Sequence, residues 1–306
     1  MTAPAVTVVA PAKVNLILRI LDRRPDGYHN LWSLMQTVGL ADTLTIALDP
    51  DSTDVHVTCT HPDVPLGPAN LVYRAAQAVF DRAGIRTGVR IVLEKHIPMG
   101  AGLGGGSSNA AATVVGLVRL LDLRWTAAEM ADATHLLGSD VPFFFYAPTA
   151  VVTGRGETVR PLRVAGQRWL LLVNPGFGVE TAWAYRTLAA GRTQAPPVPE
   201  GLRALGATGV EWRQIASLMG NDFEDVVFPH HPMLKTLKER LREAGAESAF
   251  LSGTGATVFG VFPSLEAAER ARDGMVGQSA WKTWVVPTES EGMRAEVSSG
   301  SPAQPS

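Results

Sequence analysis

The chain has one cysteine, no excess of charge of either sign and no long apolar run, and each scarcity excludes a class of protein. A lone Cys59 cannot form an intrachain disulfide. The 27 Lys and Arg against 29 Asp and Glu leave a net charge of -2, which gives no general attraction to nucleic acid or to an anionic membrane. No stretch approaches the ~20 apolar residues that cross a bilayer. The first residues also lack the basic start and apolar stretch of a signal peptide. We therefore expect a cytoplasmic protein that binds no nucleic acid and no membrane.

Hydrophobic residues make up 46% of the 306 residues, enough for a substantial core. A chain of this length is commonly divided into two domains of roughly 100 to 200 residues each. Strand patterns dominate the start of the chain, and a new pattern of strands and helices begins near residue 169. We predict an N-terminal domain at 1–165 and a C-terminal α+β domain at 166–287. Residues 288–306 have little to bury and are predicted to be a disordered tail.

The strand pattern at 13–20 separates apolar from polar side chains. Period 2 places four apolar residues on one face, namely Val14, Leu16, Leu18 and Ile20. Lys13 and Asn15 then project together from the opposite face. A lysine on a strand is usually a solvated surface charge, so this pair alone indicates no function.

A glycine-rich segment lies between a predicted strand at 88–94 and a predicted helix at 110–121. It consists of Pro98, Met99, Gly100, Ala101, Gly102, Leu103, Gly104, Gly105, Gly106, Ser107 and Ser108. Ser107, Ser108 and Asn109 are suitable N-cap types for the helix. Glycines let backbone N–H groups turn toward an anion, and the helix N-terminus adds about half a positive charge. The segment predicts a polyphosphate site, because a merely flexible linker is seldom placed so tightly between a strand and a capped helix.

The glycine pattern distinguishes between classes of phosphate loop. A Walker A loop needs Gly-Lys before its Ser or Thr, and here Gly106 runs directly into Ser107, which excludes that class. Gly100, Gly102 and Gly105 fit the G-x-G-x-x-G spacing of dinucleotide-binding folds, so an NAD-dependent oxidoreductase is an alternative. That fold requires a second parallel strand ending in an acidic residue, whereas this sequence continues as a helix.

Phosphoryl transfer without a lysine in the loop needs cations from elsewhere. Mg²⁺ and a distant lysine are the expected suppliers, and Ser107 or Ser108 is a candidate to position the metal. A carboxylate is also wanted to accept the proton of the attacking hydroxyl. Asp140, just before the apolar run 141–146, and Lys13 are the candidates. From the sequence alone, Asp140 is equally well interpreted as the cap of a turn or short helix.

Three segments resemble, in order and spacing, the motifs of the galactokinase, homoserine kinase, mevalonate kinase and phosphomevalonate kinase superfamily, the GHMP kinases. They are residues 11–16, the glycine segment and residues 252–256. Residues 26–29, 138–142 and 221–224 further resemble the branch of that superfamily that phosphorylates a cytidine-diphosphate-linked methylerythritol, a step of the non-mevalonate route to isoprenoids. The resemblance implies an α+β, two-domain GHMP-kinase-like fold, with a ribosomal-protein-like N-terminal domain and a ferredoxin-like C-terminal domain.

The same resemblance implies roles for individual residues. With ATP and Mg²⁺ as cofactors, Asp140 matches the catalytic aspartate that takes the proton of the substrate's 2-hydroxyl, and Lys13 matches the lysine that orients this hydroxyl. Asn70 and Lys95 join the glycine segment in lining the nucleotide pocket. The residues implied to bind the substrate are Asn15, Tyr28, His29, Tyr185, Gly253, Thr254 and Gly255. Tyr28 and Tyr185 are expected to stack on cytosine, and His29 to hydrogen-bond its edge.

Several alternatives stay open at this point. Tyr185 lies in a predicted helix beside Trp183, where it is also interpretable as a core residue, and the glycines at 253–256 suit an ordinary tight turn. Another kinase of the superfamily, such as homoserine or mevalonate kinase, is disfavoured by Tyr28 and His29, because those substrates have no cytosine to stack. An RNA-binding module is disfavoured by the near-neutral charge. For the quaternary structure we expect a monomer or a homodimer.

Overall fold

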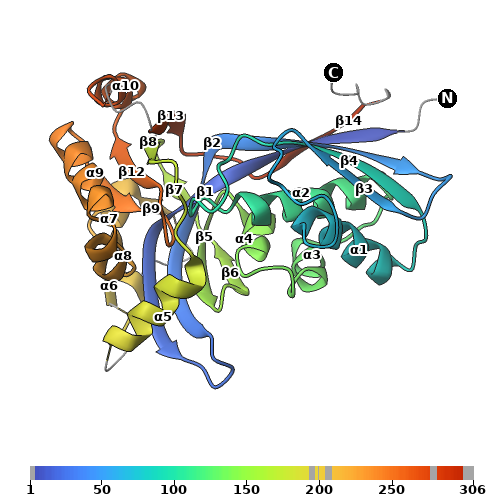
Figure 1. Ribbon diagram of the computed structural model, residues 1–306, viewed down its shortest axis with the longest axis horizontal. Helices are drawn as coiled ribbons and strands as arrows, with labels where there is room; N and C mark the ends of the chain where they lie inside the picture. Colours follow the sequence, from blue (N-terminus) through green and yellow to red (C-terminus); the bar gives the residue numbers. More distant parts are fainter. Residues whose placement is uncertain (1–3, 193–196, 199, 204–208, 276–280, 299–306) are drawn as a thin grey trace.

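The computed structural model describes residues 4–192, 197–198, 200–203, 209–275 and 281–298. Two units of sheet and helices lie side by side, and the two longest strands run from one unit toward the other (Figure 1). Within the described ranges, no helix is both long enough and apolar enough to cross a membrane.

The first sheet is organised by β1 (Ala5–Arg23) and β2 (His29–Asp49), which pair antiparallel over nearly their whole length. Its path runs β10-β1-β2-β4-β3, while β14 adds to β1, β5 to β2 and β6 to β5. The shorter strands are β3 (Val55–Cys59), β4 (Gly88–Glu94), β5 (Thr149–Gly154), β6 (Thr158–Pro161), β10 (Gly220–Asn221) and β14 (Arg294–Ser298). Most strands in proteins have about 5–6 residues, whereas β1 has 19 and β2 has 21. This length lets both strands reach both units.

The apolar side chains of β1 change faces partway along the strand. The pairing with β2 shifts register between Asn15 and Ile17. Val14 and Leu16 pack in the core between the two sheets, whereas Leu18 belongs to the core beneath the helices. The prediction of one apolar face from Val14 to Ile20 is therefore wrong, because a bulge of one residue reverses the alternation of side chains. As a result Leu18 joins Lys13 and Asn15 in lining a cavity.

Four helices cover one face of the first sheet (Figure 1). They are α1 (Leu71–Ala83), α2 (Gly105–Leu120), α3 (Ala127–Ala133) and α4 (Val141–Tyr146). Helix α2 crosses β1 and β2 closely at Gly116, where an added Cβ would lie 2.5 Å from Cδ1 of Ile46 and 3.2 Å from Cγ1 of Val6. The absence of a side chain at Gly116 lets α2 approach the sheet closely, which sets the distance of the helix N-terminus from the sheet.

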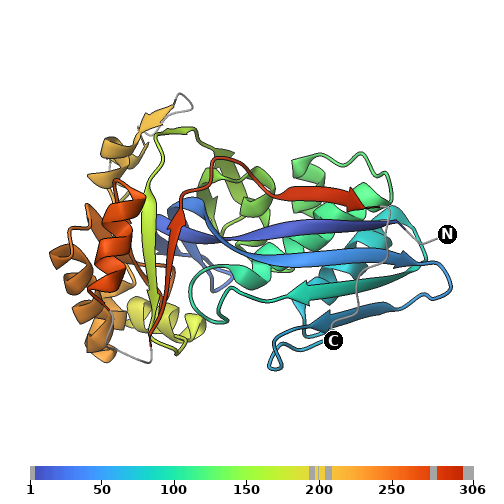
Figure 2. The ribbon, with the colours of Figure 1, turned by 90° about the horizontal axis from the view of Figure 1, so that it is seen from above.

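The second unit has an antiparallel sheet in the order β11-β12-β8-β13. The strands are β8 (Trp169–Asn174), β11 (Ser248–Leu251), β12 (Val258–Phe262) and β13 (Lys282–Pro287), and the longer helices are α5 (Thr181–Gly191), α8 (Glu224–His230), α9 (Pro232–Glu243) and α10 (Leu265–Asp273). Shorter elements are β7 (Val164–Ala165), α6 (Glu200–Arg203), β9 (Val210–Glu211) and α7 (Trp212–Ala216). Helices α9 and α10 cover the outer face of this sheet (Figure 2). The first strand of the unit lies between the third and the fourth, as in ferredoxin-like folds, so the predicted α+β fold class is confirmed.

The two units share a hydrophobic core. Alternate residues of β8 face opposite ways: Leu171 and Val173 pack with the helices, while Leu170 and Leu172 belong to the same buried cluster as Leu34 of β2. Interfaces between domains are usually more polar than this. The apolar contact therefore holds both walls of any site between the units in a fixed relation.

The C-terminal segment corrects one prediction. Strand β14 pairs antiparallel with the start of β1, from Ala5 opposite Ser298 to Val9 opposite Arg294. The prediction of a disordered tail is therefore wrong for 288–298, where free backbone groups along the edge of β1 supplied partners that composition does not show. Residues 299–306 lie outside the described part of the chain. The proposed division at 165 and 166 falls between β7 and β8 and stays a prediction.

The close approach of α2 predicts a cost for any side chain at Gly116. Replacement of Gly116 by Val should lower the free energy of unfolding by roughly 1–3 kcal/mol, because the added methyl groups overpack the contact with Ile46. Gly191, at the end of α5, has open space around it and serves as the matched control. Urea unfolding followed by circular dichroism should give a lower midpoint for Gly116→Val than for Gly191→Val. Equal midpoints would contradict the packing argument.

Candidate active site

The glycine segment forms the turn from β4 into α2. Helix α2 begins at Gly105, with Gly104 as its N-cap at φ 68°, and its first helical hydrogen bond runs from the amide of Ser108 to the carbonyl of Gly104. The predicted start after Asn109 is thus too late, because a left-handed Gly104 turns the chain into the helix five residues earlier. The N–H groups of Gly105, Gly106 and Ser107 precede that first bond, which is the arrangement that binds phosphate at helix N-termini.

Both units hold the glycine segment in place. The amide of Lys13 donates to the carbonyl of Leu103 at 3.0 Å, and the hydroxyl of Ser252 donates to the carbonyl of Gly102 at 2.9 Å. A Cβ at Gly102 would lie 2.0 Å from the carbonyl oxygen of Ser252, so only glycine permits this contact. The segment is therefore a fixed cradle between the units and not a flexible linker.

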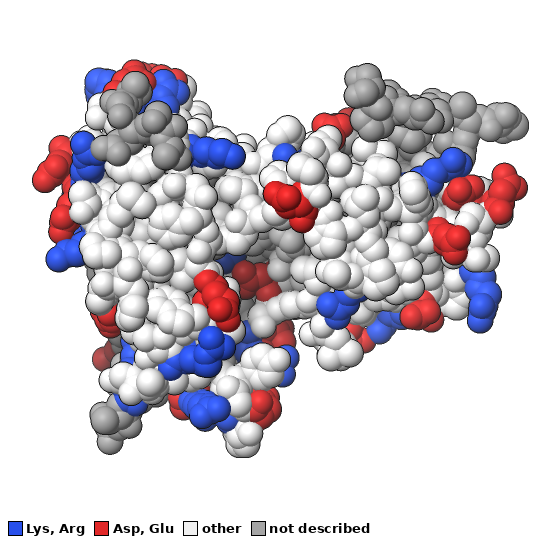
Figure 3. All heavy atoms as spheres, in the orientation of Figure 1, with Lys and Arg blue, Asp and Glu red and all other residues white. Residues whose placement is uncertain are grey.

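A cavity of 570 Å³ opens in front of this cradle, in the hollow between the two lobes seen in Figure 3. Most of the predicted site residues line it, although they come from distant parts of the chain. These are Lys13, Asn15, Asn70, Lys95, the segment 98–107, Asp140, Tyr185, Gly253 and Thr254. Asn70 also caps α1, because its side chain accepts from the amide of Val72 at 2.8 Å.

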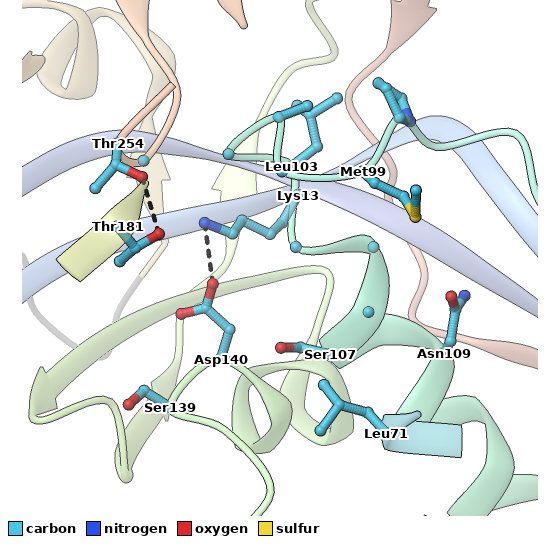
Figure 4. A pocket seen from close by; sticks show the side chains of 18 of the residues that line it. Lys13, Leu71, Met99, Leu103, Ser107, Asn109, Ser139, Asp140, Thr181 and Thr254 are labelled. Carbon is cyan, nitrogen blue, oxygen red and sulfur yellow. Dashed lines mark hydrogen bonds and ion pairs between the residues drawn. The ribbon is translucent and has the colours of Figure 1, made fainter. Parts of the chain in front are cut away.

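Lys13 and Asp140 face one another across the cavity (Figure 4). The ammonium of Lys13 lies 3.1 Å from a carboxylate oxygen of Asp140 and donates to the side-chain oxygen of Asn15 at 2.7 Å. The amide of Asn15 in turn donates to the hydroxyl of Ser33 at 2.9 Å. A lysine ammonium has three donors, and the described partners take two of them. The third is available to an oxygen of a ligand.

Asp140 does not cap the helix that it precedes. It occupies the N-cap position of α4, yet within the described structure its side chain makes no capping hydrogen bond and pairs with Lys13 instead. The side chain of Lys13 is 4% exposed and that of Asp140 is 29% exposed. The carboxylate is thus reachable from the cavity while its cationic partner is buried.

A second buried lysine lies at the other end of the cradle. Lys95 forms an ion pair with Asp42 of β2, which also accepts from the amides of His96 and Ile97 and from the side chain of Asn109. A Cβ placed on Gly105 would lie 2.9 Å from the ammonium of Lys95, so this cation reaches the first turn of α2. Backbone bonds from the segment after β4 and a side-chain bond from α2 hold the carboxylate of Asp42, which in turn fixes Lys95.

A second cavity of 730 Å³ adjoins the first and is lined by the aromatic residues predicted to bind the substrate. Tyr28, His29 and Tyr185 line it, and Tyr185 is common to both cavities, as are Ser139, Arg155 and Thr181. Three arginines line this second cavity, namely Arg23, Arg155 and Arg186, and no carboxylate does so among the described residues. Its lining favours a ligand that is both aromatic and anionic.

The rings of this second cavity are packed against one another. His29 stacks on Tyr185 with centroids 5.6 Å apart, and Phe223 meets Tyr185 edge-on with centroids 4.8 Å apart. The guanidinium of Arg155 lies 4.3 Å from the centroid of Tyr28. Burial, and secondarily the charge of Asp140, raises the pKa of Tyr185, so its hydroxyl remains a hydrogen-bond donor. Burial and the charge of Arg23 lower the pKa of His29.

Two predicted residues lie away from the cavities. The side chain of Ser108 is fully buried, and its hydroxyl has no hydrogen-bond partner among the described residues. It lies on the inner face of α2 because the helix starts earlier than predicted. Gly255 does not line either described cavity, and its amide already donates to the carbonyl of Ser252 at 2.9 Å. Ser108 is thus an unsuitable metal ligand, and Gly255 supports the turn rather than a ligand.

The residues present fit a nucleotide better than a protein-held metal. The described residues contain no group of three or more His, Cys, Asp or Glu that could hold a metal ion. Mg²⁺ often keeps several waters and binds through one or two protein groups plus substrate phosphates. Ser107, whose side chain points into the cavity near Asp140, is the hydroxyl suited to that role (Figure 4).

Sequence reasoning missed Asp42, Arg155 and Thr181. Asp42 had a readable signal: with Leu40, Leu44 and Ile46 it follows the period of the buried face of β2, and a carboxylate in such a place needs a cation. Arg155 follows Gly154 in the turn between β5 and β6, where the sequence shows only a turn. The hydroxyl of Thr181 lies 3.2 Å from that of Thr254, a contact between α5 and the loop after β11 that no local pattern predicts.

Comparisons with known proteins agree with this arrangement. Residues 70–147 match the GHMP kinases N terminal domain, and residues 206–279 match the GHMP kinases C terminal domain. The 4-diphosphocytidyl-2-C-methyl-D-erythritol kinase of Syntrophotalea carbinolica is 41% identical over 278 residues, which are 91% of this chain and 97% of the relative. The enzyme of the same name from Pelobacter propionicus is 41% identical over 285 residues, 93% of this chain and 99% of the relative.

Solved structures give the same result. A crystal structure of 4-(cytidine 5'-diphospho)-2C-methyl-D-erythritol kinase has a TM-score of 0.75 and 34% identity, covering 92% of this chain and 99% of that one. Homoserine kinase from Cytophaga hutchinsonii has a TM-score of 0.73 at 20% identity, over 95% and 97% of the two chains, and supports the fold alone. The chain therefore belongs to the GHMP kinases and, within them, to the family of 4-diphosphocytidyl-2-C-methyl-D-erythritol kinases.

Proposed function

We propose that this kinase transfers the γ-phosphate of ATP, with Mg²⁺, to the 2-hydroxyl of 4-diphosphocytidyl-2-C-methyl-D-erythritol, giving the 2-phosphate and ADP. The observation that carries the proposal is the continuity of the two cavities. The glycine cradle and the Lys13–Asp140 pair line one, Tyr28 and His29 line the other, and Tyr185 lines both. A substrate with a phosphoryl acceptor at one end and a cytosine at the other fits this shape.

The glycine cradle and Lys95 are proposed to bind ATP. The amides of Gly105, Gly106 and Ser107 supply donors to the phosphates, and the N-terminus of α2 favours negative charge there. Lys95, held by Asp42 beside Gly105, adds a cation, and Asn70 lines the same cavity. Mg²⁺ would neutralise further phosphate charge when bound, with Ser107 as its hydroxyl ligand.

Asp140 and Lys13 are proposed to act on the acceptor hydroxyl. Phosphoryl transfer has a loose transition state, so correct placement of the hydroxyl matters more than its intrinsic reactivity. Asp140 presents its partly exposed carboxylate as the acceptor of the hydroxyl proton. The remaining donor of the Lys13 ammonium orients the hydroxyl oxygen, and Asn15 fixes that ammonium from the other side.

The second cavity is proposed to bind the cytidine diphosphate. Tyr28 and Tyr185 offer rings for the base, and base stacking on an aromatic side chain contributes ~1–3 kcal/mol. His29 offers one donor and one acceptor nitrogen to the edge of the base while it is neutral. The three arginines of this cavity suit a diphosphate, whereas homoserine and mevalonate carry neither a base nor a diphosphate. Gly253 and Thr254 line the first cavity from the second unit and would meet the substrate near the transferred phosphate.

Two alternative functions lose support. An RNA-binding module would need a basic stripe, and on the face shown in Figure 3 Lys and Arg are interspersed with Asp and Glu. A dinucleotide-dependent oxidoreductase would need the strand after the glycine helix to lie parallel beside β4, whereas the next strand, β5, pairs antiparallel with β2.

The substrate assignment predicts a clear preference among acceptors. With ATP and Mg²⁺, the purified protein should phosphorylate 4-diphosphocytidyl-2-C-methyl-D-erythritol with a far higher kcat/KM than homoserine, mevalonate or galactose. A coupled assay of ADP release with each acceptor at equal concentration measures this. Turnover of one of the other acceptors together with none of the cytidylated compound would overturn the proposal.

The position of Asp140 predicts a loss of chemistry without a loss of nucleotide binding. Asp140→Asn should lower kcat by roughly 10²-fold or more, because an amide cannot take the hydroxyl proton. The KM for ATP should stay within about threefold of wild type, since the cradle of α2 is unchanged. Asp132→Asn, which alters an exposed carboxylate paired with Arg82, is the control. A normal kcat in Asp140→Asn would remove this residue from the reaction.

The lowered pKa of His29 predicts an acid limb in the pH profile. Burial and Arg23 shift this pKa below its ordinary value of 6.5, with Arg192 acting in the same direction and Asp22 against it. The imidazole is therefore neutral at pH 7, and its acceptor nitrogen is lost only as the pH falls below 6.5. The kcat/KM for the cytidylated substrate should decline over that acid range. His29→Gln keeps a donor and an acceptor at every pH, and an acid limb of unchanged size in that variant would contradict the assignment.

A further inference from the structure

Helix α5 forms one wall of the second cavity, and its buried apolar contacts do not extend to its C-terminal end. The residues that it contributes to the cavity lining are Thr181, Ala182, Tyr185, Arg186, Ala189 and Ala190. Among its described side chains, Ala184 and Leu188 are buried, and the half-buried rings of Trp183 and Tyr185 also pack on the core. No described side chain of the helix after Leu188 is buried, so other contacts must fix its C-terminal end.

The carboxylate of Asp222 supplies one such contact. Asp222 follows β10, is 8% exposed, and accepts from the guanidinium of Arg19 at 3.0 Å and from the amide of Ile20 at 2.9 Å. It also accepts from Arg192, the residue directly after α5, at 3.1 Å. One buried carboxylate thus connects the end of α5 to two residues of β1.

Arg192 completes the connection with a bond of its own. The nitrogen that donates to Asp222 also donates to the backbone carbonyl of Ile20 at 3.0 Å. A guanidinium can serve both acceptors because its donors are arranged in a planar fork, which a lysine cannot reproduce. The C-terminal end of α5 is therefore bound to β1 directly through the carbonyl of Ile20 and indirectly through Asp222.

Phe223, the residue after Asp222, contacts the middle of α5. Phe223 packs edge-on against the ring of Tyr185, whose other neighbour is His29. The preceding residue, Asn221, donates from its side chain to the carbonyls of Leu251 and Gly253 at 2.7 Å each. The segment 221–224, which the sequence marked without a role, touches two walls of the site at once.

We propose that Asp222 and Arg192 are positioning residues for substrate recognition, whose ion pair holds α5 against β1 so that the ring of Tyr185 stays in register with the base-binding cavity. This inference rests on the proposed function, in which Tyr185 stacks on cytosine. The pair acts through the helix and touches no substrate. Its loss weakens capture of the cytidylated substrate and leaves the ATP cradle intact, because Lys13 and Ser252 hold that cradle through Leu103 and Gly102, without a bond from α5.

The test is a double-mutant cycle on the intact protein between Arg192 and Tyr185. Arg192→Ala should raise the KM for the cytidylated substrate about tenfold while the KM for ATP changes less than about twofold. Arg192→Lys should lie between Arg192→Ala and wild type, because it keeps the charge but not the fork. Asp222→Asn should resemble Arg192→Ala, since an amide is a poor partner for two guanidinium groups.

The cycle separates positioning from general destabilisation. If Arg192 acts through Tyr185, then adding Arg192→Ala to Tyr185→Ala should raise the KM no further than Tyr185→Ala alone. Arg168→Ala is the matched control, because Arg168 pairs with Glu247 at 3.0 Å and is 24% exposed against 22% for Arg192, yet it lies outside both cavities. This control should keep the wild-type KM for both substrates.

Distinct outcomes overturn the two proposals. Additive effects of Arg192→Ala and Tyr185→Ala, or an equal rise in the KM for ATP, would overturn the positioning role alone. If Arg192→Ala unfolds, the Arg192→Lys variant decides: a wild-type KM in that folded variant would also overturn it. An unchanged KM in Tyr185→Ala, with normal turnover by the wild-type protein, would remove Tyr185 from base binding and the positioning role with it. No turnover of the cytidylated substrate by the wild-type protein would overturn the proposed function itself.

Discussion

The antiparallel pairing of β1 with β2 is the constraint on which the rest of the structure depends. The two strands are long enough to serve both units, and several residues of the candidate site lie on them or in the turn between them. Lys13 and Asn15 lie on β1, His29 and Asp42 lie on β2, and the turn between the strands carries Tyr28. The register of one ladder therefore sets the distance between the Lys13–Asp140 pair and the second cavity, where the base is proposed to bind. A slip of one residue in this ladder would turn Lys13 away from Asp140 and into the apolar core.

Buried cations in this protein are matched by carboxylates before any ligand is present. Lys13 lies against Asp140, and Lys95 against Asp42. A buried charge without a partner is costly, so these pairs are a condition of folding as well as of function. They also hold each ammonium in one orientation. Groups that are already oriented need not reorganise when charge develops during phosphoryl transfer.

Much of the fold and part of the site could be predicted from local patterns. The glycine segment predicted a phosphate cradle because a glycine-rich turn before a helix is a local pattern. Lys13 and Asp140 were identified through their motifs. The start of α2, the fate of Ser108 and the order of residues 288–298 were mispredicted. Each of those depends on a left-handed glycine or on a strand edge formed far away in the sequence.

What local patterns cannot show is which distant groups meet. Tyr185 had no neighbouring motif, and the structure was needed to show that its ring contacts both His29 and Phe223 and lines both cavities. Arg192 was missed for the same reason, and although the period of β2 marked Asp42 as buried, the sequence did not identify Lys95 as its partner. The bulge in β1 reversed a pattern of alternation that holds only for a regular strand.

The return of β14 to the first sheet has a consequence for the way in which the chain can be divided. Strand β10 lies within the stretch of chain that forms the second unit, and β14 follows that stretch, yet both strands pair with β1 in the first sheet. The chain thus returns to the first sheet during and after the second unit. A single cut between the units would remove both flanking strands from β1 and expose its unpaired N–H and C=O groups. The two units have separate sheets, but the pairing of β10 and β14 with β1 makes them one folding unit.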